Sequence, residues 1–168
     1  VDFTKKLGEI EDAVYKLVDC KFNLSSPRQV GEIIFEKLQI VENAKKTKTG
    51  QYSTSEEVLE SLRGKHEVID LILEYRGIKK LLSTYVDSLP TLINSKSGKI
   101  HTSFNQTITA TGRLSSSNPN LQNIPIRDDY GKEIRKAFIA DKDCYLLAAD
   151  YSQIELRLLA HFSNDAQM

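Results

Sequence analysis

The sequence has few cysteines and no long apolar run. Its two cysteines, Cys20 and Cys144, lie far apart and form no CxxC pair, which argues against a disulfide framework or zinc site and predicts packed thiols in a reducing cytoplasm. The apolar runs are too short to span a membrane. Charged residues arrive too early at the N-terminus for a signal peptide. These absences predict a cytoplasmic globular protein with no membrane partner.

The chain also lacks a net charge, because 23 Lys and Arg residues balance 23 Asp and Glu residues. This balance gives no support to nucleic-acid binding. The distribution is less even, since Asp and Glu are absent from Ser88 through Arg127 while Lys96, Lys99 and Arg113 are present. Neutral donors with a few cations suit a surface that touches phosphates, sugars or base edges. A polar loop region is the alternative, and composition alone favours it.

The first 94 residues are predicted to form four helices, because apolar residues recur at helical spacing. Between the second and third helices, residues 44–52 carry three lysines and no acid, which predicts a flexible basic loop. The expected helices run from Asp2 to Val18, from a cap at Ser26 to about Leu38, from a cap at Thr54 to Gly64, and from about Glu67 to Leu89.

The composition changes near Ser95, which is therefore the predicted domain boundary. The alternation of Ile100, Thr102, Phe104, Gln106 and Ile108 predicts a strand at 100–108, with a hairpin partner as an option. Residues 111–126 contain Gly112 and two prolines and are predicted to be irregular.

Further along, residues 130–138 predict a short helix. The apolar stretch 145–149 predicts a buried strand, and an apolar-periodic helix follows it through Phe162. The whole pattern predicts an α+β fold that is mostly helical. Its two parts are a helical region at 1–94 and a mixed region with a few β-strands at 95–168.

Asp150 ends the predicted buried strand and opens the run DYSQIELR. A carboxylate at such a place is unfavourable unless a positive charge meets it, and a divalent metal ion is the usual partner. A helix cap or a turn residue is the alternative for an isolated aspartate. A second distinctive block, TATGRLSSSNPNLQNIPIR, occupies residues 109–127.

Together the two blocks resemble the polymerase domain of family A DNA polymerases, and its bacterial members most closely. The stretches SPRQVGEIIFEKL, KKTKTGQYSTSEEVLE and ILEYRGIKKLLSTYVDSLPTLIN match in order and at compatible spacing, so the resemblance spans essentially the whole chain. It implies a helical thumb region at residues 1–94. Residues 95–168 are then a partial palm that ends just after the first metal-binding aspartate motif.

The implied chemistry is nucleotidyl transfer with two Mg²⁺ ions, in which a primer 3′-hydroxyl attacks the α-phosphate of a deoxynucleoside triphosphate. Asp150 matches the first metal-binding aspartate, and Tyr151 the neighbour whose backbone carbonyl completes the metal site. Glu155 matches the steric gate against the ribose 2′-hydroxyl, and a favourable charge in the first helical turn is a compatible second role. Asp150 and Glu155 are thus the implied catalytic residues. The implied nucleotide-binding residues are Tyr151, Ser152, Gln153, Ile154 and Glu155.

The resemblance also implies contacts with primer–template DNA. Arg113 matches an arginine that reaches the minor groove at the primer terminus, where it tests base pairing without reading sequence. Arg127 is expected to contact phosphate or to pair with Asp128 or Asp129. Residues expected to hydrogen-bond nearby sugars and backbone, with self-capping of the loop as the alternative, are Asn120, Gln122 and Asn123.

The thumb region is expected to grip the duplex through its phosphates, which gives affinity and salt dependence without sequence choice. Many relatives have a lysine where this chain has Leu82, so that contact is lost or taken over by Lys79 or Lys80. The matching positions are Lys48, Gln51, Ser53, Lys80, Ser83 and Thr84.

The second catalytic aspartate of the family and its triphosphate-binding helix are not in this sequence. We therefore expect a piece of a longer polymerase of DNA repair and replication, active near the bacterial nucleoid, with the rest of that chain as a partner. Alone, the piece is expected to bind primer–template DNA without catalysis. A stand-alone duplex-binding module is the alternative. A metal-dependent phosphohydrolase would need further carboxylates that converge on Asp150.

Overall fold

The structure is a computed structural model that describes residues 2–42, 44, 46–47, 50–126, 129–165 and 167. The chain divides into two compact units, Val1–Arg135 and Lys136–Met168. The first unit continues through Ser95, and the predicted subdomain boundary at that residue stays a prediction.

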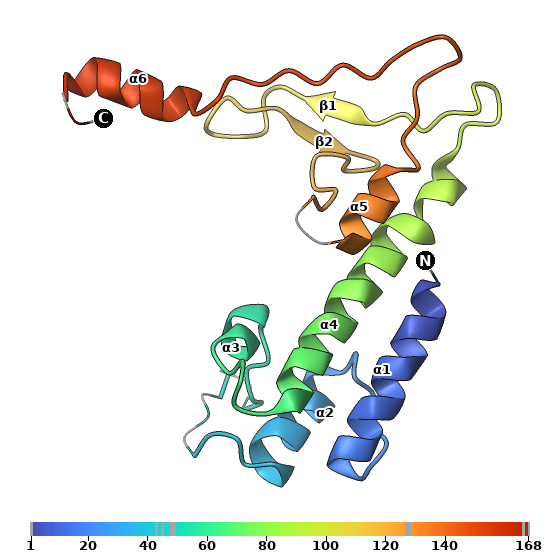
Figure 1. Ribbon diagram of the computed structural model, residues 1–168, viewed down its shortest axis with the longest axis vertical. Helices are drawn as coiled ribbons and strands as arrows, with labels where there is room; N and C mark the ends of the chain where they lie inside the picture. The colour runs from blue at the N-terminus through green and yellow to red at the C-terminus, as the bar shows by residue number, and fades with distance from the viewer. Residues whose placement is uncertain are drawn as a thin grey trace. The chain divides into compact units, whose positions relative to one another are not determined.

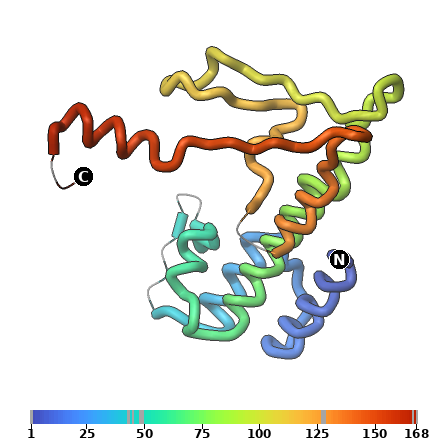
Figure 2. Tube along the Cα trace, turned by 45° about the horizontal axis from the view of Figure 1, so that its top comes forward, coloured from blue at the N-terminus to red at the C-terminus, as the bar shows by residue number. Residues whose placement is uncertain are grey.

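Two long helices form the centre of the first unit. α1 (Phe3–Val18) and α4 (Glu67–Leu81) lie side by side and run in opposite directions (Figure 1; Figure 2). Ile69 and Ile72 of α4 are fully buried. Complete burial of an isoleucine side chain stabilises the fold by about 1.5–3 kcal/mol. The contact between α1 and α4, which buries several such side chains, is therefore the main core of the unit. The buried stripe of α1 consists of Phe3, Leu7, Ile10, Val14 and Val18.

The sequence predicted α1 correctly, and Asp2 caps the helix by accepting a hydrogen bond from the Lys5 amide at 3.0 Å. The predicted helix at 67–89 is also present but changes its geometry along its length. After α4 a π-helical turn runs over Leu82–Val86, and a 3₁₀-helix follows at Leu89–Leu92. In the π-helical turn the Asp87 amide donates to the Leu82 carbonyl at 2.9 Å, which is one residue beyond the α-helical pattern.

The second predicted helix is α2 (Pro27–Gly31), followed by a π-helical turn at Glu32–Lys37. Ser26 caps it as expected, since its hydroxyl accepts from the Gln29 amide at 3.4 Å. A side chain at Gly31 would place its Cβ 3.0 Å from the Cβ of Tyr52. The glycine therefore lets α2 approach the following loop.

The predicted cap of the third helix is wrong by one residue. α3 spans Glu56–Glu60, and the Ser55 hydroxyl accepts from the Val58 amide at 3.4 Å. Thr54 is buried instead, because its hydroxyl donates to the Pro27 carbonyl at 3.5 Å and accepts from Arg76 at 3.2 Å. These long-range partners draw Thr54 inward and leave the cap to its neighbour.

Among the described residues of the first unit, β1 (Ser103–Asn105) and β2 (Ser115–Ser117) form an antiparallel pair of strands, and Lys46 and Tyr52 form an isolated bridge. Phe104 lies opposite Ser116. The strand predicted at 100–108 is thus confirmed over three residues. Its partner β2 lies in the segment that was predicted to be irregular.

α5 (Asp129–Arg135) corresponds to the short helix predicted at 130–138, and it packs against α4. Its Gly131 is buried against Pro125: an added Cβ would lie 2.7 Å from the proline Cβ and 2.8 Å from its carbonyl oxygen. Only glycine permits this approach of helix and loop.

In the second unit the predicted helix is present as α6 (Ile154–Ser163), but the predicted buried strand at 145–149 is wrong. Those residues have no regular structure, and Tyr145 and Leu147 are 96% and 93% exposed. A strand needs a hydrogen-bonded neighbour, and no described residues of the chain pair with this segment.

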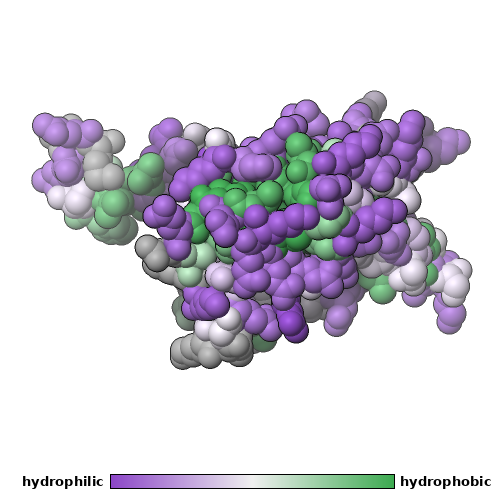
Figure 3. Space-filling view, turned by 90° about the horizontal axis from the view of Figure 1, so that it is seen from below, coloured by the Kyte–Doolittle hydropathy of each residue, from purple (hydrophilic) through white to green (hydrophobic). Residues whose placement is uncertain are grey.

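The thiol prediction is wrong for Cys144, which is exposed, whereas Cys20 is half-buried. On the face shown in Figure 3, polar side chains border a smaller area of apolar surface. Among the described residues, no helix is both long and apolar enough to cross a membrane.

Candidate nucleic-acid interface

A groove of about 1370 Å³ lies in the first unit, along the length of α4, and the loop that follows β2 lines one part of it. It brings together two sets of predicted DNA-binding residues that are distant in sequence. The residues of these sets that line it are Lys80, Thr84, Asn120, Gln122 and Asn123. Lys80, Thr84, Gln122 and Asn123 are exposed, so their polar groups are accessible to a ligand.

The loop after β2 is organised by buried Ser116. Its hydroxyl donates to Asn120 Oδ1 at 3.0 Å and accepts from the Leu121 amide at 3.1 Å. Asn120 Oδ1 also accepts from the Gln122 amide at 3.1 Å. The self-capping alternative for Asn120 is therefore present. It engages the side-chain oxygen, while the donors of the side chain are on its NH₂ group.

Side chains from two other elements hold the next part of this loop. The Tyr85 hydroxyl donates to the Asn123 carbonyl at 2.6 Å. Arg135 donates from Nη2 to the Ile124 carbonyl at 2.9 Å and from Nε to the Pro125 carbonyl at 3.0 Å. Burial raises the pKa of Tyr85 above its usual value, so the phenol remains a donor at neutral pH.

Sequence reasoning assigned neither residue to the site. Tyr85 showed only as part of the apolar stripe of a helix, and Arg135 only as one residue of a short predicted helix. No local signal connects either residue to the loop. Tyr85 lies 38 residues from Asn123, and Arg135 lies 10 and 11 residues from the two carbonyls that it binds.

The groove is not uniformly basic. Arg63 pairs with Glu60 at 2.5 Å and with Asp70 at 3.0 Å, which offsets part of the negative charge at one end. Glu67 and Lys80 lie near opposite ends of α4, about 20 Å apart along the helix. This exceeds the Debye length of about 8 Å, so phosphate attraction is confined to the Lys80 end. The lining carboxylates are Glu56, Glu60, Glu67, Asp70 and Glu74.

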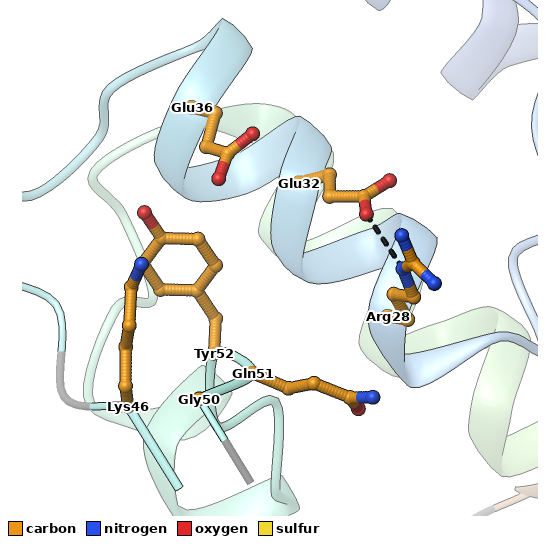
Figure 4. Close-up of a pocket in the computed structure, with 7 residues that line it drawn as sticks. All are labelled: Arg28, Glu32, Glu36, Lys46, Gly50, Gln51 and Tyr52. Atoms are coloured by element: carbon orange, nitrogen blue, oxygen red, sulfur yellow. Dashed lines mark hydrogen bonds and ion pairs between the residues drawn. The ribbon is translucent and has the colours of Figure 1, made fainter.

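A second, smaller pocket of about 310 Å³ lies beside the loop between α2 and α3 (Figure 4). Lys46 Nζ lies 4.6 Å from the centre of the Tyr52 ring. The backbone amide of Thr47 donates a hydrogen bond to the Gln51 carbonyl at 2.6 Å. The side chain of Gln51 is thus carried by a loop with defined contacts. The lining residues are Arg28, Glu32, Glu36, Lys46, Gly50, Gln51 and Tyr52.

The remaining predicted DNA contacts are dispersed. Ser53 is half-buried, and Ser83 is exposed, with its hydroxyl donating to the Lys80 carbonyl at 3.3 Å. Arg113 is exposed and does not line the groove. Lys48 and Arg127 lie outside the described residues.

In the second unit, Asp150 is exposed in the irregular segment before α6. Glu155 lies in the first turn of that helix, as expected. Gln153 adopts a left-handed conformation with φ of 54°, and Arg157 Nε donates to the Ser152 carbonyl at 2.9 Å. These contacts define how the chain enters the helix.

The residues present supply only part of a magnesium site. Among the described residues, no group of three His, Cys, Asp or Glu side chains comes together to hold a metal ion. The Asp150 carboxylate and the Tyr151 carbonyl are suitable oxygen ligands, but Mg²⁺ requires about six. The same finding gives no support to the phosphohydrolase alternative.

Comparison with known proteins identifies the family. The sequence model for DNA polymerase family A matches residues 1–168. The chain is 58% identical over 162 residues to DNA polymerase I of Synechocystis, covering 96% of this chain and 16% of that protein. It is 53% identical over 164 residues to DNA polymerase I of Bacillus subtilis, covering 97% of this chain and 18% of the relative. The chain thus spans less than a fifth of these two curated relatives.

The fold has a solved counterpart. The polymerase domain of Pol1 from M. smegmatis, solved in complex with DNA primer–template and dNTP, matches with a TM-score of 0.82 and 42% identity. The match covers 98% of this chain and 29% of that one. The family model and the solved structure both match nearly the whole chain, and the chain belongs to DNA polymerase family A.

Proposed function

We propose that the residues lining the groove grip the primer–template duplex within a template-directed DNA polymerase. This proposal rests on the groove, which is lined by Lys80 and Thr84 together with the side-chain amides of Asn120, Gln122 and Asn123. At the Lys80 end of the groove, one exposed cation beside several neutral donors suits contact with sugars and phosphates of a duplex of any sequence. The related M. smegmatis polymerase domain was solved with primer–template DNA and dNTP, which supports the same ligand class here.

The dispersed residues extend the proposed grip. Lys48, Gln51, Ser53 and Ser83 are proposed to contact phosphates along the duplex. Arg113 is proposed to reach the minor groove at the primer terminus, where acceptors are present on every base pair. Arg127 is proposed to contact a phosphate near the same loop.

Asp150 and the carbonyl of Tyr151 are proposed to hold Mg²⁺ in the complete polymerase, together with ligands from elsewhere in that protein. Bound Mg²⁺ ions lower the pKa of the attacking hydroxyl and stabilise charge on the reacting oxygens. Glu155, in the first turn of α6, is proposed to exclude a ribose 2′-hydroxyl, and residues 151–155 to contact the incoming nucleotide. Because the described residues do not complete the metal site, the 168-residue chain alone is proposed to bind DNA without catalysis.

Fluorescence anisotropy of a labelled primer–template, titrated with the chain across a salt series, tests the grip. Lys80→Ala is expected to weaken binding and to reduce the slope of log K against log salt by about 0.9, the value for one lost phosphate contact. Lys16→Ala is the matched control, since Lys16 is an exposed lysine on α1 that does not line the groove. Equal effects of the two substitutions, or no binding by the unsubstituted chain, would contradict the proposal.

A primer-extension assay with Mg²⁺ and all four deoxynucleotides tests the second part. The purified chain is expected to leave the primer unextended. Sustained extension that stops on addition of EDTA would show that the chain completes its metal site without other residues.

A further inference from the structure

We propose that Tyr85 and Arg135 are positioning residues that fix the loop 120–125 in its DNA-binding conformation before the duplex arrives. This inference rests on the proposed function, because it assigns these two residues to the same groove. Neither side chain needs to touch DNA for this role. Each acts through the backbone of the loop.

The geometry of the contacts carries the proposal. Three successive carbonyls, those of Asn123, Ile124 and Pro125, accept hydrogen bonds from two side chains of different elements. The guanidinium of Arg135 spans two of them in the fixed geometry of its planar fork, which a lysine ammonium on a flexible stem lacks. Three bonded carbonyls in a row leave this stretch of loop with little freedom to rotate.

The packing on both sides reinforces this restraint. Pro125 lies so close to Gly131 of α5 that a Cβ on the glycine would be 2.8 Å from the proline carbonyl oxygen. At the other end, buried Ser116 holds the amides of Leu121 and Gln122 at 3.1 and 3.3 Å. The loop is thus fixed at both ends, and the side chains between these ends line the groove.

A restrained loop strengthens binding because the loss of conformational freedom has occurred on folding and need not occur on association. A loop without the restraint would sample many conformations, and few of them would place the amide donors correctly. Loss of the restraint therefore weakens DNA binding without removing any charge that faces the phosphates.

The test compares Tyr85→Phe and Arg135→Lys with Tyr75→Phe. Tyr75 is another buried tyrosine and lies on α4, and its hydroxyl donates to Glu11 at 2.8 Å, away from the loop. Tyr75→Phe therefore removes a buried tyrosine hydroxyl, with its hydrogen bonds to Glu11 and Ser25, without touching the loop. Arg135→Lys keeps the positive charge and removes the fork. Two readouts are needed: hydrogen exchange of the Leu121 and Gln122 amides by NMR without DNA, and primer–template affinity across a salt series.

Tyr85→Phe is expected to weaken DNA binding about three- to tenfold, the effect of one lost neutral hydrogen bond, with an unchanged salt slope. Arg135→Lys is expected to weaken it at least as much, again without a change in slope. Both substitutions should speed exchange at the Leu121 and Gln122 amides, and Tyr75→Phe should alter neither readout.

Unchanged exchange in both loop variants would overturn the restraint, whatever happens to DNA affinity. Faster exchange with unchanged affinity would overturn its role in binding. An unaltered affinity in Arg135→Lys combined with a lower slope in Arg135→Gln would assign Arg135 to a direct phosphate contact instead. Absence of DNA binding by the unsubstituted chain would refute the proposed function, while the exchange data alone would still decide whether the restraint exists.

Discussion

The two units of the chain contain similar apolar residue types but differ in how far they bury them. In the unit 1–135 the helices α1 and α4 bury a continuous core, and all the buried hydrophobic side chains of the described structure lie there. In the unit 136–168 none of the described residues is buried. Its large exposed side chains include Tyr145, Leu146, Leu147, Leu156, Leu158, Leu159 and Phe162.

This difference shows that an apolar pattern specifies a face but does not supply the surface that covers it. α1 and α6 are both amphipathic, yet α1 lies against α4 whereas the apolar residues of α6 are exposed. An isolated helix of ten residues is marginal in water. We therefore expect the stability of the chain to reside in the first unit.

The largest expected effect comes from the core itself. Ile72→Ala removes a fully buried side chain of α4 and is expected to lower the free energy of unfolding by about 2–5 kcal/mol, measured by urea denaturation. Leu158→Ala in α6, where the side chain is 49% exposed, should change it by less than about 0.5 kcal/mol. A comparable loss in both variants would show that the second unit has a core of its own.

A smaller loss is expected from Gly131→Ala, because the new Cβ would meet the Pro125 carbonyl oxygen at 2.8 Å. Overpacking of this kind costs about 1–3 kcal/mol. Gly77→Ala is the matched control on α4, where a Cβ would meet nothing within 4 Å. There the substitution should stabilise the helix by up to about 1 kcal/mol. Thermal unfolding of the two variants should therefore shift in opposite directions.

Alkaline pH should affect the first unit through its buried phenols. Burial raises the pKa of Tyr15, Tyr75 and Tyr85 above their usual value. The unfolded chain loses these protons first, so their contribution is fully present below about pH 10 and is lost as the pH rises further. Urea midpoints should fall above that pH. Tyr85→Phe should make the fall less steep.

The smallest expected effect concerns two helix ends of the same geometry. Asp19 after α1 and Asn164 after α6 both adopt left-handed conformations, with φ of 49° and 54°. Glycine at such a site should raise the free energy of unfolding by about 0.5 kcal/mol. Glycine relieves the strain of the left-handed conformation, and the greater conformational entropy of glycine in the unfolded chain offsets part of that gain. Asp19→Gly should raise the urea midpoint, and Asn164→Gly should leave it unchanged. Equal gains would mean that both units unfold together.

Helical periodicity predicted the first unit well, because helices α1 and α4 are determined by residues within a few positions of one another. The cap of α3 was wrong for a non-local reason. Thr54 and Ser55 are both suitable caps, and only the contacts of Thr54 with Pro27 and Arg76 decide between them. No pattern within the helix contains that information.

The strand predicted at 145–149 was wrong because strands depend on partners that periodicity does not report. The candidate site shows the same limit. Similarity to the family indicated the side-chain amides of Asn120, Gln122 and Asn123. The contacts of Tyr85 and Arg135 with the backbone of that loop are visible only in the structure.

The π-helical turn at Leu82–Val86 has a consequence for insertions and deletions. It accommodates one residue more than an ordinary α-helical turn, and successive residues of an α-helix are separated by about 100° around the axis. Removal of one residue there would let α4 continue as a regular helix and would turn the ring of Tyr85 away from Asn123. The hold on the loop therefore depends on the number of residues in this turn as well as on their identity. Homologues of different length at this point are expected to fasten the loop in another way.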